Sequence, residues 1–467
     1  MSTSGKPSTD PANPTESHAE SADRHNANKA RSAANLDEAR RRATQKRNYN
    51  SDATRSRLRE LFAETWHCEP RSWQIDITEA ILLGLDSVLI AGTGSGKTMP
   101  FMLTLKYDTA ATVLVISPLK ILQEDQACRF CAAGIPSCAV NGDTYGAVRK
   151  DLESMQYRAL LTSPEMCLET DSFRKFLTSP GLQKSVRAVI IDEAHCIAQW
   201  GGDFRKHYGM LHKLRALFPA TVPFLAATAT LPPLALKEVC DKLHIDLDES
   251  YFVNLGNDRH NISQHVRFIN SARDYSALKD LLSVDAQERK DLVKTIVFVN
   301  SRNGTQEVCR EVRRLLPRRL RRYVDFLHAV RKDWTKRKIM QRFRRGRIRI
   351  LIATEAAGMG ADIPDIIQVI QLGAPSSLSV YLQRAGRAVR DVVLQGRAFL
   401  LVEKSAFKLQ KRKPPKKKAA DDCQMAWGKV IHPSLRTYIT HPSCRRDTSD
   451  AYFDNPPRQR RKSWVHE

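Results

Sequence analysis

A glycine-rich stretch at residues 91–98 (AGTGSGKT) lies between a short apolar run and a segment with helical spacing, the context that a phosphate-binding loop requires. Its glycines let backbone N–H groups cradle phosphate oxygens, and the following helix N-terminus adds partial positive charge. Lys97 can reach the β- and γ-phosphates of ATP, and Thr98 can bind Mg²⁺. A purely structural turn is the alternative, but it would not need Lys followed by Thr. The candidate ATP-binding residues here are Ala91, Gly92, Thr93, Gly94, Ser95, Gly96, Lys97 and Thr98.

Two adjacent carboxylates, Asp192 and Glu193, end an apolar run about a hundred residues further on. The carboxyl end of a parallel strand is where such groups meet a bound ligand. Asp192 would hold Mg²⁺, and Glu193 would orient and deprotonate the attacking water. A strand that simply ends in solvent is the alternative, and the glycine-rich loop upstream favours the functional interpretation.

These residues need a scaffold, and the apolar runs predict one. Short runs alternate with helical patterns, which indicates βαβ units and parallel sheets. The alternation breaks near residues 255–270, a predicted linker, and then resumes, so we expect two α/β domains in tandem. The predicted boundaries are a disordered or loosely helical segment at 1–50, domains at 51–262 and 263–403, and a basic, largely disordered tail at 404–467. The predicted strands are residues 87–91, 112–117, 159–162, 188–192, 224–228, 295–299, 323–327, 349–352, 367–370 and 398–402.

The charge of the chain is one-sided: its 467 residues carry a net charge of +24. Such an excess favours a polyanionic partner such as nucleic acid. Two arginine-rich stretches, 313–322 and 342–349, are candidates for phosphate contact, with solvated helix faces as the alternative. The basic tail suits phosphate binding or nuclear import, and a tail without a dedicated partner is equally compatible. Ten scattered cysteines indicate a reducing compartment, and neither a membrane span nor a signal peptide is predicted, which leaves cytosol or nucleus.

Residues 192–205 (DEAHCIAQWGGDFR) resemble the DEAH box and aromatic-rich loop of the RecQ helicases of superfamily 2. In that family the loop senses single-stranded DNA and couples its binding to hydrolysis. Aromatic side chains suit this task because they stack on any base. Packing in the core is the alternative for the two aromatics. The matching positions are Gln199, Trp200, Asp203, Phe204 and Arg205.

Further stretches resemble RecQ motifs in the family's order. Arg71 and Gln74 are similar to its adenine-recognition element, although Pro70 stands where an aromatic is usual. Val330 and Val389 stand where the family has glycine. The resemblance implies arginine fingers at Arg387 and Arg390. It also implies a catalytic role for Gln383 and ATP binding by Gly360 and Asp362. Coupling of hydrolysis to movement is implied for His195, Thr228 and Thr230. The implied DNA-binding residues are Ser117, Pro118, Gln126, Ser163, Asn300, Ser301, Arg302 and Thr354.

The resemblance covers roughly residues 55–403. It implies two RecA-like domains of the P-loop NTPase class, with ATP and Mg²⁺ in the cleft between them. The implied activity is 3′-to-5′ DNA helicase or translocase, acting on single strands and duplex junctions during repair or recombination in the nucleus. Two alternatives stay open: an RNA-dependent ATPase or helicase, and a degenerate nucleic-acid-binding motor.

A structural zinc site is not predicted, because only Cys423 and Cys444 follow the motor region. A complete winged helix after the motor is not expected either. Cys128, Cys131 and Cys138 have spacing that could bind metal, but their helical context favours packing.

Overall fold

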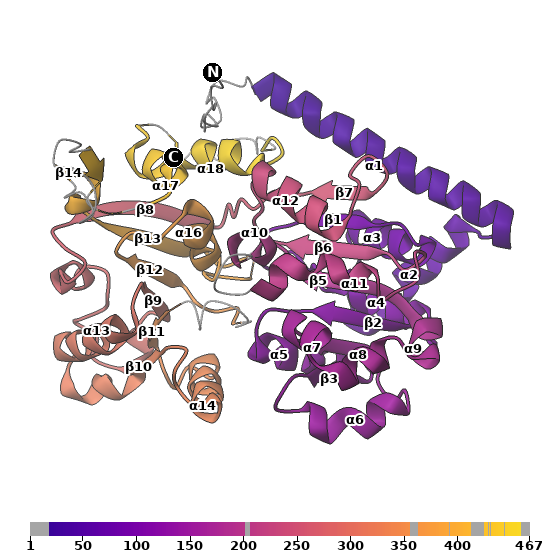
Figure 1. Cartoon of the computed structure of the whole chain (residues 1–467). Coiled ribbons are helices and arrows are strands. Elements are labelled where there is room, and N and C mark those ends of the chain that lie inside the picture. Colours follow the sequence, from indigo (N-terminus) through magenta and orange to yellow (C-terminus); the bar gives the residue numbers. More distant parts are fainter. Residues whose placement is uncertain are drawn as a thin grey trace, which may run out of the picture.

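The computed structural model describes residues 18–200, 206–354, 363–391, 393–411, 425–427, 429, 431–442 and 444–458. Two parallel sheets, each with its own helices, lie side by side (Figure 1). The change from one sheet to the other falls between residues 254 and 262. No helix in the described part of the chain has the length and apolar character needed to cross a membrane.

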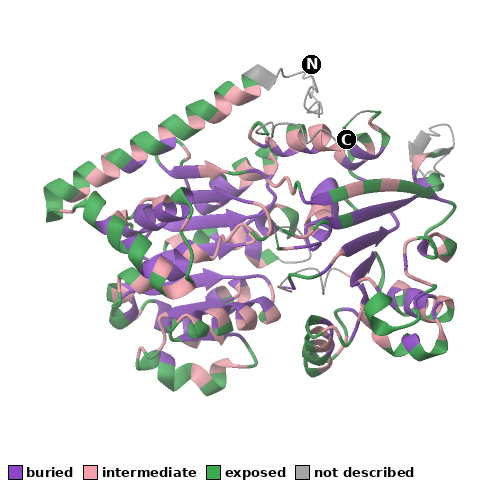
Figure 2. Ribbon diagram, turned by 180° about the vertical axis from the view of Figure 1, so that it is seen from behind, coloured by how far each residue is buried: buried purple, intermediate pink, exposed green. Residues whose placement is uncertain are grey.

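The first sheet has seven strands in the order β3-β4-β2-β5-β6-β1-β7. Neighbouring residues of one strand enter different apolar cores: Val88 and Ile90 pack on one side of the sheet and Leu89 on the other. Both faces are therefore covered, as parallel sheets require, and Figure 2 shows the strands as buried. The strands are β1 Ser87–Ile90, β2 Thr112–Ile116, β3 Ser137–Val140, β4 Ala159–Thr162, β5 Val186–Asp192, β6 Phe224–Thr228 and β7 Tyr251–Asn254.

Helices flank this sheet on both faces. They are α2 Ser51–Trp66, α3 Ser72–Leu83, α4 Met99–Tyr107, α5 Lys120–Ala132, α6 Tyr145–Glu153, α7 Pro164–Glu169, α8 Asp171–Leu177, α9 Pro180–Ser185, α10 Cys196–Trp200, α11 His212–Arg215 and α12 Pro233–Leu243. Helix α4 begins directly after the glycine-rich loop, and Pro100 in its first turn suits a helix start because the missing N–H is not needed there.

The second sheet has six parallel strands in the order β10-β11-β9-β12-β13-β8. Part of the predicted linker is wrong: residues 262–269 form β8, which pairs with β13 at the sheet edge. The strands are β8 Ile262–Ile269, β9 Thr295–Val299, β10 Val324–Leu327, β11 Ile350–Ala353, β12 Gln368–Leu372 and β13 Gly396–Glu403. The helices are α13 Arg302–Leu315, α14 Asp333–Arg344 and α16 Leu378–Ala385. Short 3₁₀ helices lie at Lys206–Met210, Tyr275–Leu278, Arg289–Asp291, Arg318–Tyr323 and Lys404–Phe407.

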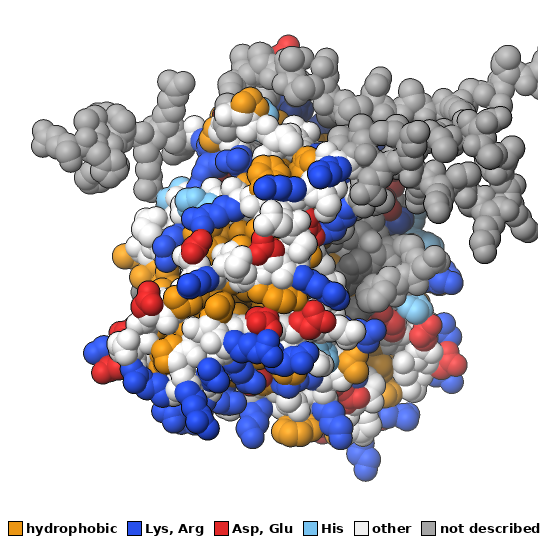
Figure 3. Space-filling model, turned by 90° about the vertical axis from the view of Figure 1, so that its left-hand side faces the viewer, with side chains coloured by type: hydrophobic (Ala, Val, Ile, Leu, Met, Phe, Trp, Pro, Cys, Tyr) orange, Lys and Arg blue, Asp and Glu red, His pale blue; other side chains and the backbone are white. Residues whose placement is uncertain are grey.

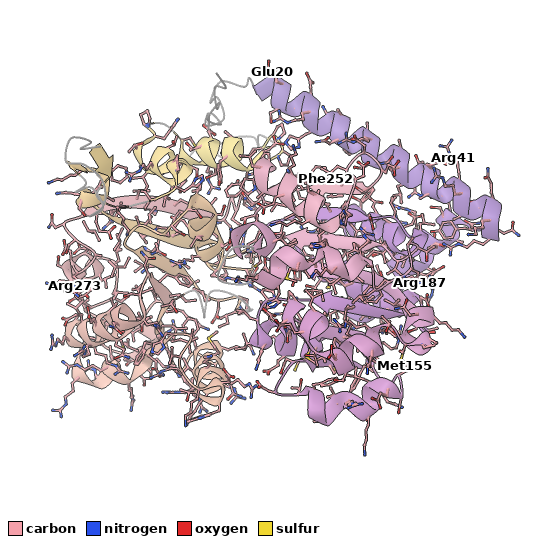
Figure 4. The ribbon with its side chains drawn as sticks, viewed as in Figure 1. Glu20, Arg41, Met155, Arg187, Phe252 and Arg273 are labelled. Carbon is pink, nitrogen blue, oxygen red and sulfur yellow. The ribbon has the colours of Figure 1, made fainter. Side chains whose placement is uncertain are left out.

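The N-terminal segment corrects one prediction. A disordered or loosely helical segment was expected over residues 1–50, and α1 (His18–Arg47) is instead a regular 30-residue helix that lies along the first domain (Figure 1). Ser32 exchanges hydrogen bonds with the backbone of Phe252, labelled on β7 in Figure 4. Asn35 donates to two backbone carbonyls just before β7, and Leu36 is buried. The helix thus covers the exposed edge of the sheet with polar contacts, which an apolar pattern does not reveal.

The C-terminal segment corrects another prediction. Residues 404–467 were expected to be largely disordered, yet α17 (Pro433–Thr440) and α18 (Arg445–Phe453) pack on the second domain. Leu435, Tyr438 and Phe453 are buried in that domain's core. A two-stranded antiparallel ladder precedes them, β14 Leu409–Lys411 with β15 Met425–Trp427. The few apolar residues of α17 share one helix face, and this spacing is enough to dock a short helix.

Helix α18 and the residues after it hold the linker between the two sheets. Arg446 pairs with Asp258 and donates to the carbonyl of Ile262 at 2.7 Å. The Asn455 amide donates to Asn257 Oδ1 at 2.9 Å. Contacts from α18 and the residues just after it therefore hold the linker in place.

The α1 helix is joined to the first domain by a buried carboxylate, Glu79 of α3, whose side chain is 0% exposed. It accepts hydrogen bonds from Arg40, Tyr49, Ser51 and Arg55, with distances between 2.5 and 3.1 Å. Burial raises the pKa of Glu79, but the bonds from Arg40, Ser51 and Arg55 outweigh it, so the net pKa lies below the usual range.

Glu79→Ala is expected to lower the free energy of unfolding by about 1–3 kcal/mol, because Arg40 and Arg55 would lose their shared buried acceptor and keep only their pairs with Asp37 and Asp76. Chemical denaturation measures the loss. The matched control is Glu38→Ala on the outer face of α1, where the ion pairs are exposed and little change is expected. An equal loss in both variants would contradict a structural role for Glu79.

Candidate ATP site and nucleic-acid surface

The glycine-rich loop joins β1 to α4, and its backbone adopts conformations that suit glycine. Gly94 and Gly96 have φ of 84° and 89°, in the left-handed region. Lys97 Nζ donates to the carbonyls of Ala91 at 2.8 Å and Gly92 at 3.3 Å, so the ammonium lies over the loop. Burial lowers the pKa of Lys97. The loop and its lysine therefore have the geometry that grips phosphate groups.

Gln74 lies behind the loop and stabilises it. Its Nε2 donates to the Gly96 carbonyl at 3.3 Å, and its Oε1 accepts from the Arg71 backbone N–H at 2.8 Å. A Cβ on Gly96 would come within 2.7 Å of Gln74 Nε2 and displace it, and the φ of 89° itself favours glycine there. The two residues that resemble an adenine-recognition element thus adjoin the phosphate loop.

Asp192 ends β5 and is buried beside the loop. Its Oδ2 accepts from Gln126 Nε2 at 2.5 Å, and its Oδ1 accepts from the Glu193 backbone N–H at 3.0 Å. Burial, together with the Glu193 charge, raises the pKa of Asp192 to about 6. A buried carboxylate that is costly to ionise is a fitting ligand for a divalent cation, which would stabilise the charged form.

Glu193 follows in a left-handed backbone conformation, with φ of 53°. Such strain in a non-glycine residue is held in place by the surrounding structure and is common at active sites. Burial raises the pKa of Glu193, but the nearby His195, Lys97, Arg387 and Arg390 outweigh it, so the net pKa lies below the usual range. Glu193 is therefore ionised at neutral pH and can accept a proton.

Asp192→Asn is expected to stabilise the nucleotide-free protein by about 1–3 kcal/mol near neutral pH, since about two pKa units of unfavourable ionisation disappear. The stability contributed by the protonated acid is complete below its ordinary pKa and is lost as pH rises through about 6. The gain should therefore be small near pH 4, grow as the pH rises toward 6 and level off above about pH 7, as measured by thermal melting. Asp241→Asn, at an exposed position on α12, is the control. A gain that does not depend on pH would contradict this origin.

A chain of hydrogen bonds leads from Glu193 to the second domain. His195 Nδ1 lies 3.3 Å from Glu193 Oε2 and 2.9 Å from Thr228 Oγ1. The Thr230 backbone N–H donates to Thr228 Oγ1 at 3.3 Å. Gln383 Nε2, on α16, donates to Thr230 Oγ1 at 2.8 Å. The three predicted coupling residues thus connect the carboxylates to the opposite domain.

The second domain also brings positive charge to the phosphate loop. Arg387 and Arg390, just after α16, act on the same Lys97 and Glu193 charges. A Cβ on Gly94 would lie 3.9 Å from Arg390 Cβ. Two arginines therefore face the site from across the domain boundary, where they could neutralise charge on a transferred phosphoryl group.

Arg259, in the linker, is a site residue that sequence reasoning missed. Its Nη1 donates to the Thr93 carbonyl at 2.9 Å, and its Nη2 donates to the Val389 carbonyl. It also lies 3.5 Å from the Gly386 carbonyl. One guanidinium thus joins the phosphate loop to the arginine segment. No motif marks this arginine, and the linker position gives the one sequence signal.

Val389 has φ of 28°, which explains the glycine usual at this position in the RecQ family. The Val389 side chain is fully buried and packs against Gly396. A Cβ on Gly396 would lie 2.6 Å from Val389 Cγ2, so the absence of a side chain at Gly396 makes room for the valine. The departure from the family pattern is therefore accommodated by packing.

The predicted DNA-binding residues divide into two groups. Gln126 does not fit its predicted role, since its side chain is buried and hydrogen-bonded to Asp192. Ser117 and Pro118 are also buried at the end of β2, so they shape the backbone and present no side chain to a ligand. The remaining predicted residues are exposed or half-buried, and all but Gln199, which is in α10, lie at strand ends or helix starts: Ser163, Gln199, Asn300, Ser301, Arg302 and Thr354.

Several predicted residues lie outside the described part of the chain. These are Asp203, Phe204, Arg205, Gly360, Asp362 and the side chain of Trp200.

The arginine-rich stretches have mixed surroundings. Figure 3 shows Lys and Arg side chains gathered on the lower part of the second domain's outer face, near α13 and β10. Arg313 donates to the Val324 carbonyl at 2.7 Å, and Arg321 donates to the Leu316 carbonyl at 3.2 Å. Some of these arginines therefore serve the fold.

The cysteine prediction is partly wrong, because Cys128 and Cys131 are exposed on α5 and only Cys138 is buried. The described residues contain no group of three His, Cys, Asp or Glu side chains placed to bind a metal together.

Two family profiles match the chain: "DEAD/DEAH box helicase" over residues 71–239 and "Helicase conserved C-terminal domain" over 274–392. Among curated relatives, the mouse bifunctional 3′-5′ exonuclease/ATP-dependent helicase WRN is 30% identical over 69% of this chain and 22% of its own length. The probable ATP-dependent DNA helicase RecS of Bacillus subtilis is 31% identical over 68% of this chain and 61% of its own. The putative ATP-dependent RNA helicase R290 of Acanthamoeba polyphaga mimivirus is 27% identical over 84% of this chain and 68% of its own length.

Solved structures agree in fold. The DUF1998 helicase MrfA bound to DNA is 22% identical, with a TM-score of 0.59, over 75% of this chain and 51% of its own. The L327V variant of S. cerevisiae Dbp5, bound to RNA and ADP BeF3, is 18% identical, with a TM-score of 0.59, over 74% of this chain and 87% of its own. The chain spans less than two-thirds of the length of several of these proteins, including the first curated relative.

Proposed function

Since the chain belongs to the DEAD/DEAH box helicases and has RecQ helicases among its relatives, we propose that it hydrolyses ATP to move along single-stranded DNA and separate strands. The observation that carries this proposal is the convergence of both domains on one phosphate loop. Arg259 joins Thr93 to the arginine segment, and Gln383 joins the second domain to Thr230.

The residues divide the work as follows. Lys97 and the loop amides hold the β- and γ-phosphates, and Gln74 with Arg71 lies where the adenine would enter. Glu193 takes the proton from the attacking water. Arg387 and Arg390 stabilise charge on the phosphoryl group.

The donor set fits Mg²⁺. Asp192 and Thr98 would hold the ion, which supplies charge neutralisation at the phosphates when bound.

Hydrolysis is coupled to movement through the bonded chain of His195, Thr228, Thr230 and Gln383. A change at Glu193 alters the contact between Thr230 and Gln383, and so the relative position of the domains. DNA that crosses both domains is then gripped alternately. Movement from 3′ to 5′, and a role in repair or recombination, rest on the likeness to RecQ proteins.

The basic stretch at 411–418 supports a nuclear location, which a fluorescent fusion with and without these residues would test.

The proposal is tested by ATP hydrolysis without nucleic acid, with single-stranded DNA and with matched RNA. Stimulation by DNA and little by RNA is expected. Equal or stronger stimulation by RNA would favour RNA as the substrate, an option supported by the relative named as an RNA helicase. An absence of hydrolysis would indicate a motor that binds nucleic acid without turnover.

A further inference from the structure

An exposed tryptophan stands in the first turn of α14. Trp334 is 61% exposed, and Val330, in the turn before the helix, is 65% exposed. An exposed indole in a folded domain has no packing reason for its position, and large aromatics that stay in contact with water are common at binding surfaces.

The charge around Trp334 suits a polyanion. Residues 331–338 (RKDWTKRK) hold five basic residues and one acidic residue. The turn is ordered: the Arg331 guanidinium lies 4.0 Å from the centre of the Phe326 ring and 3.6 Å from Asp325. The Arg331 backbone N–H also donates to the His328 carbonyl at 3.2 Å. Trp334 is therefore presented on a fixed support.

The position of α14 places Trp334 between the two domains. Arg337, one turn along the helix, forms two hydrogen bonds with Glu124 of α5, at 2.7 and 3.0 Å. Arg344 pairs with Asp125 at 3.3 Å. Figure 1 shows α14 facing α5 of the first domain. Helix α5 begins at Lys120, directly after the strand end at Ser117 and Pro118.

Charges from both domains reach this turn. Lys336 hydrogen-bonds Asp333 and lowers its pKa, and Lys120 of the first domain lowers it further. Burial, then Arg331 and Arg302, lowers the pKa of His328. Lys120 and Arg302 are exposed and begin α5 and α13, so each domain offers a positive charge near this turn. The turn that carries Trp334 is therefore surrounded by positive charge from both domains.

We propose that Trp334 is a base-stacking platform on the second domain, which receives one base of single-stranded DNA as the strand passes from the first domain. This inference rests on the proposed function, since it needs a strand that crosses both domains. Because every base has a π-face, stacking would give grip without sequence preference. The platform moves with α14, so a base on it is carried when the domains move.

The test compares Trp334→Ala, Trp334→Phe and the unmodified protein, which is the full chain without a substitution. Binding to fluorescent oligothymidylate and to an abasic strand of equal length is measured for each. Trp334→Ala should weaken binding to oligothymidylate by about 5- to 100-fold, and Trp334→Phe should restore most of it. Binding to the abasic strand should be the same in all three. Leu234→Ala, at an apolar residue 86% exposed on α12, is the matched control and should bind like the full chain.

Two results would overturn the platform: equal oligothymidylate affinity in Trp334→Ala and the full chain, or an equal loss on the abasic strand. The ATPase of the unmodified chain separates this failure from a wider one. If DNA stimulates hydrolysis but Trp334→Ala binds normally, the platform alone is wrong. If the unmodified chain neither binds DNA nor responds to it, the proposed function is wrong, and the platform with it.

Discussion

Arg387→Ala is expected to lower kcat for ATP hydrolysis by about 10³- to 10⁵-fold at saturating DNA, the range for loss of an arginine finger. The reason is its position: Arg387 reaches from the second domain to the charges of Lys97 and Glu193. The planar guanidinium can bind two phosphoryl oxygens at once, so Arg387→Lys should recover only part of the rate. Steady-state phosphate release measures both variants.

Thermal melting must accompany this measurement, because Arg387 is buried and its loss could also weaken the fold. Arg397→Ala, at an exposed position on β13 of the same domain, is the matched control and should hydrolyse ATP normally. An Arg387→Ala protein that is folded and keeps more than a tenth of the rate would contradict a role in the transition state.

Glu193→Gln should reduce hydrolysis by about 10²- to 10⁴-fold, the usual contribution of a general base. Glutamine has nearly the same shape and can keep the left-handed backbone, so nucleotide binding should survive. A fluorescent ATP analogue would measure that binding beside single-turnover hydrolysis. Loss of binding and hydrolysis together would mean that Glu193 holds the loop rather than the water. Glu238→Gln, in a surface ion pair on α12, is the control.

The strands that could be predicted were continuous apolar runs buried on both faces, such as β2 and β9. Strand β8 could not, because its pattern alternates between buried and exposed residues at the sheet edge, with Phe268 exposed. The docking of the first helix on the first domain was not predicted, for a related reason. It docks through Ser32, Asn35 and Arg40, and hydrogen bonds of this kind have no periodicity that a sequence displays.

The site was more predictable than its surroundings, because its chemistry restricts residue types. Lys97, Asp192, Glu193 and Arg387 come together as their motifs indicated. Motif likeness was misleading for Gln126, where the helix direction decided the outcome. Gln123 and Gln126 share the buried face of α5, and this face points at Asp192 rather than at solvent. Arg259 could be found only from the fold.

The first and the last described helix are connected close to the linker, so the two domains are held together at a second place. Arg24 of α1, docked on the first domain, pairs with Asp454, which follows α18 on the second, at 2.6 Å. The Asp454 carbonyl accepts from Asn254 at 2.8 Å, where the linker begins. Separation of the domains must stretch or break these contacts.

The resistance of the two domains to separation is thus set partly by contacts outside the ATP site. Arg24 and Asp454 are 40% and 20% exposed, so dissolved salt screens their attraction. Salt that screens the attraction between basic side chains and phosphate groups would therefore also weaken the Arg24–Asp454 contact between the domains.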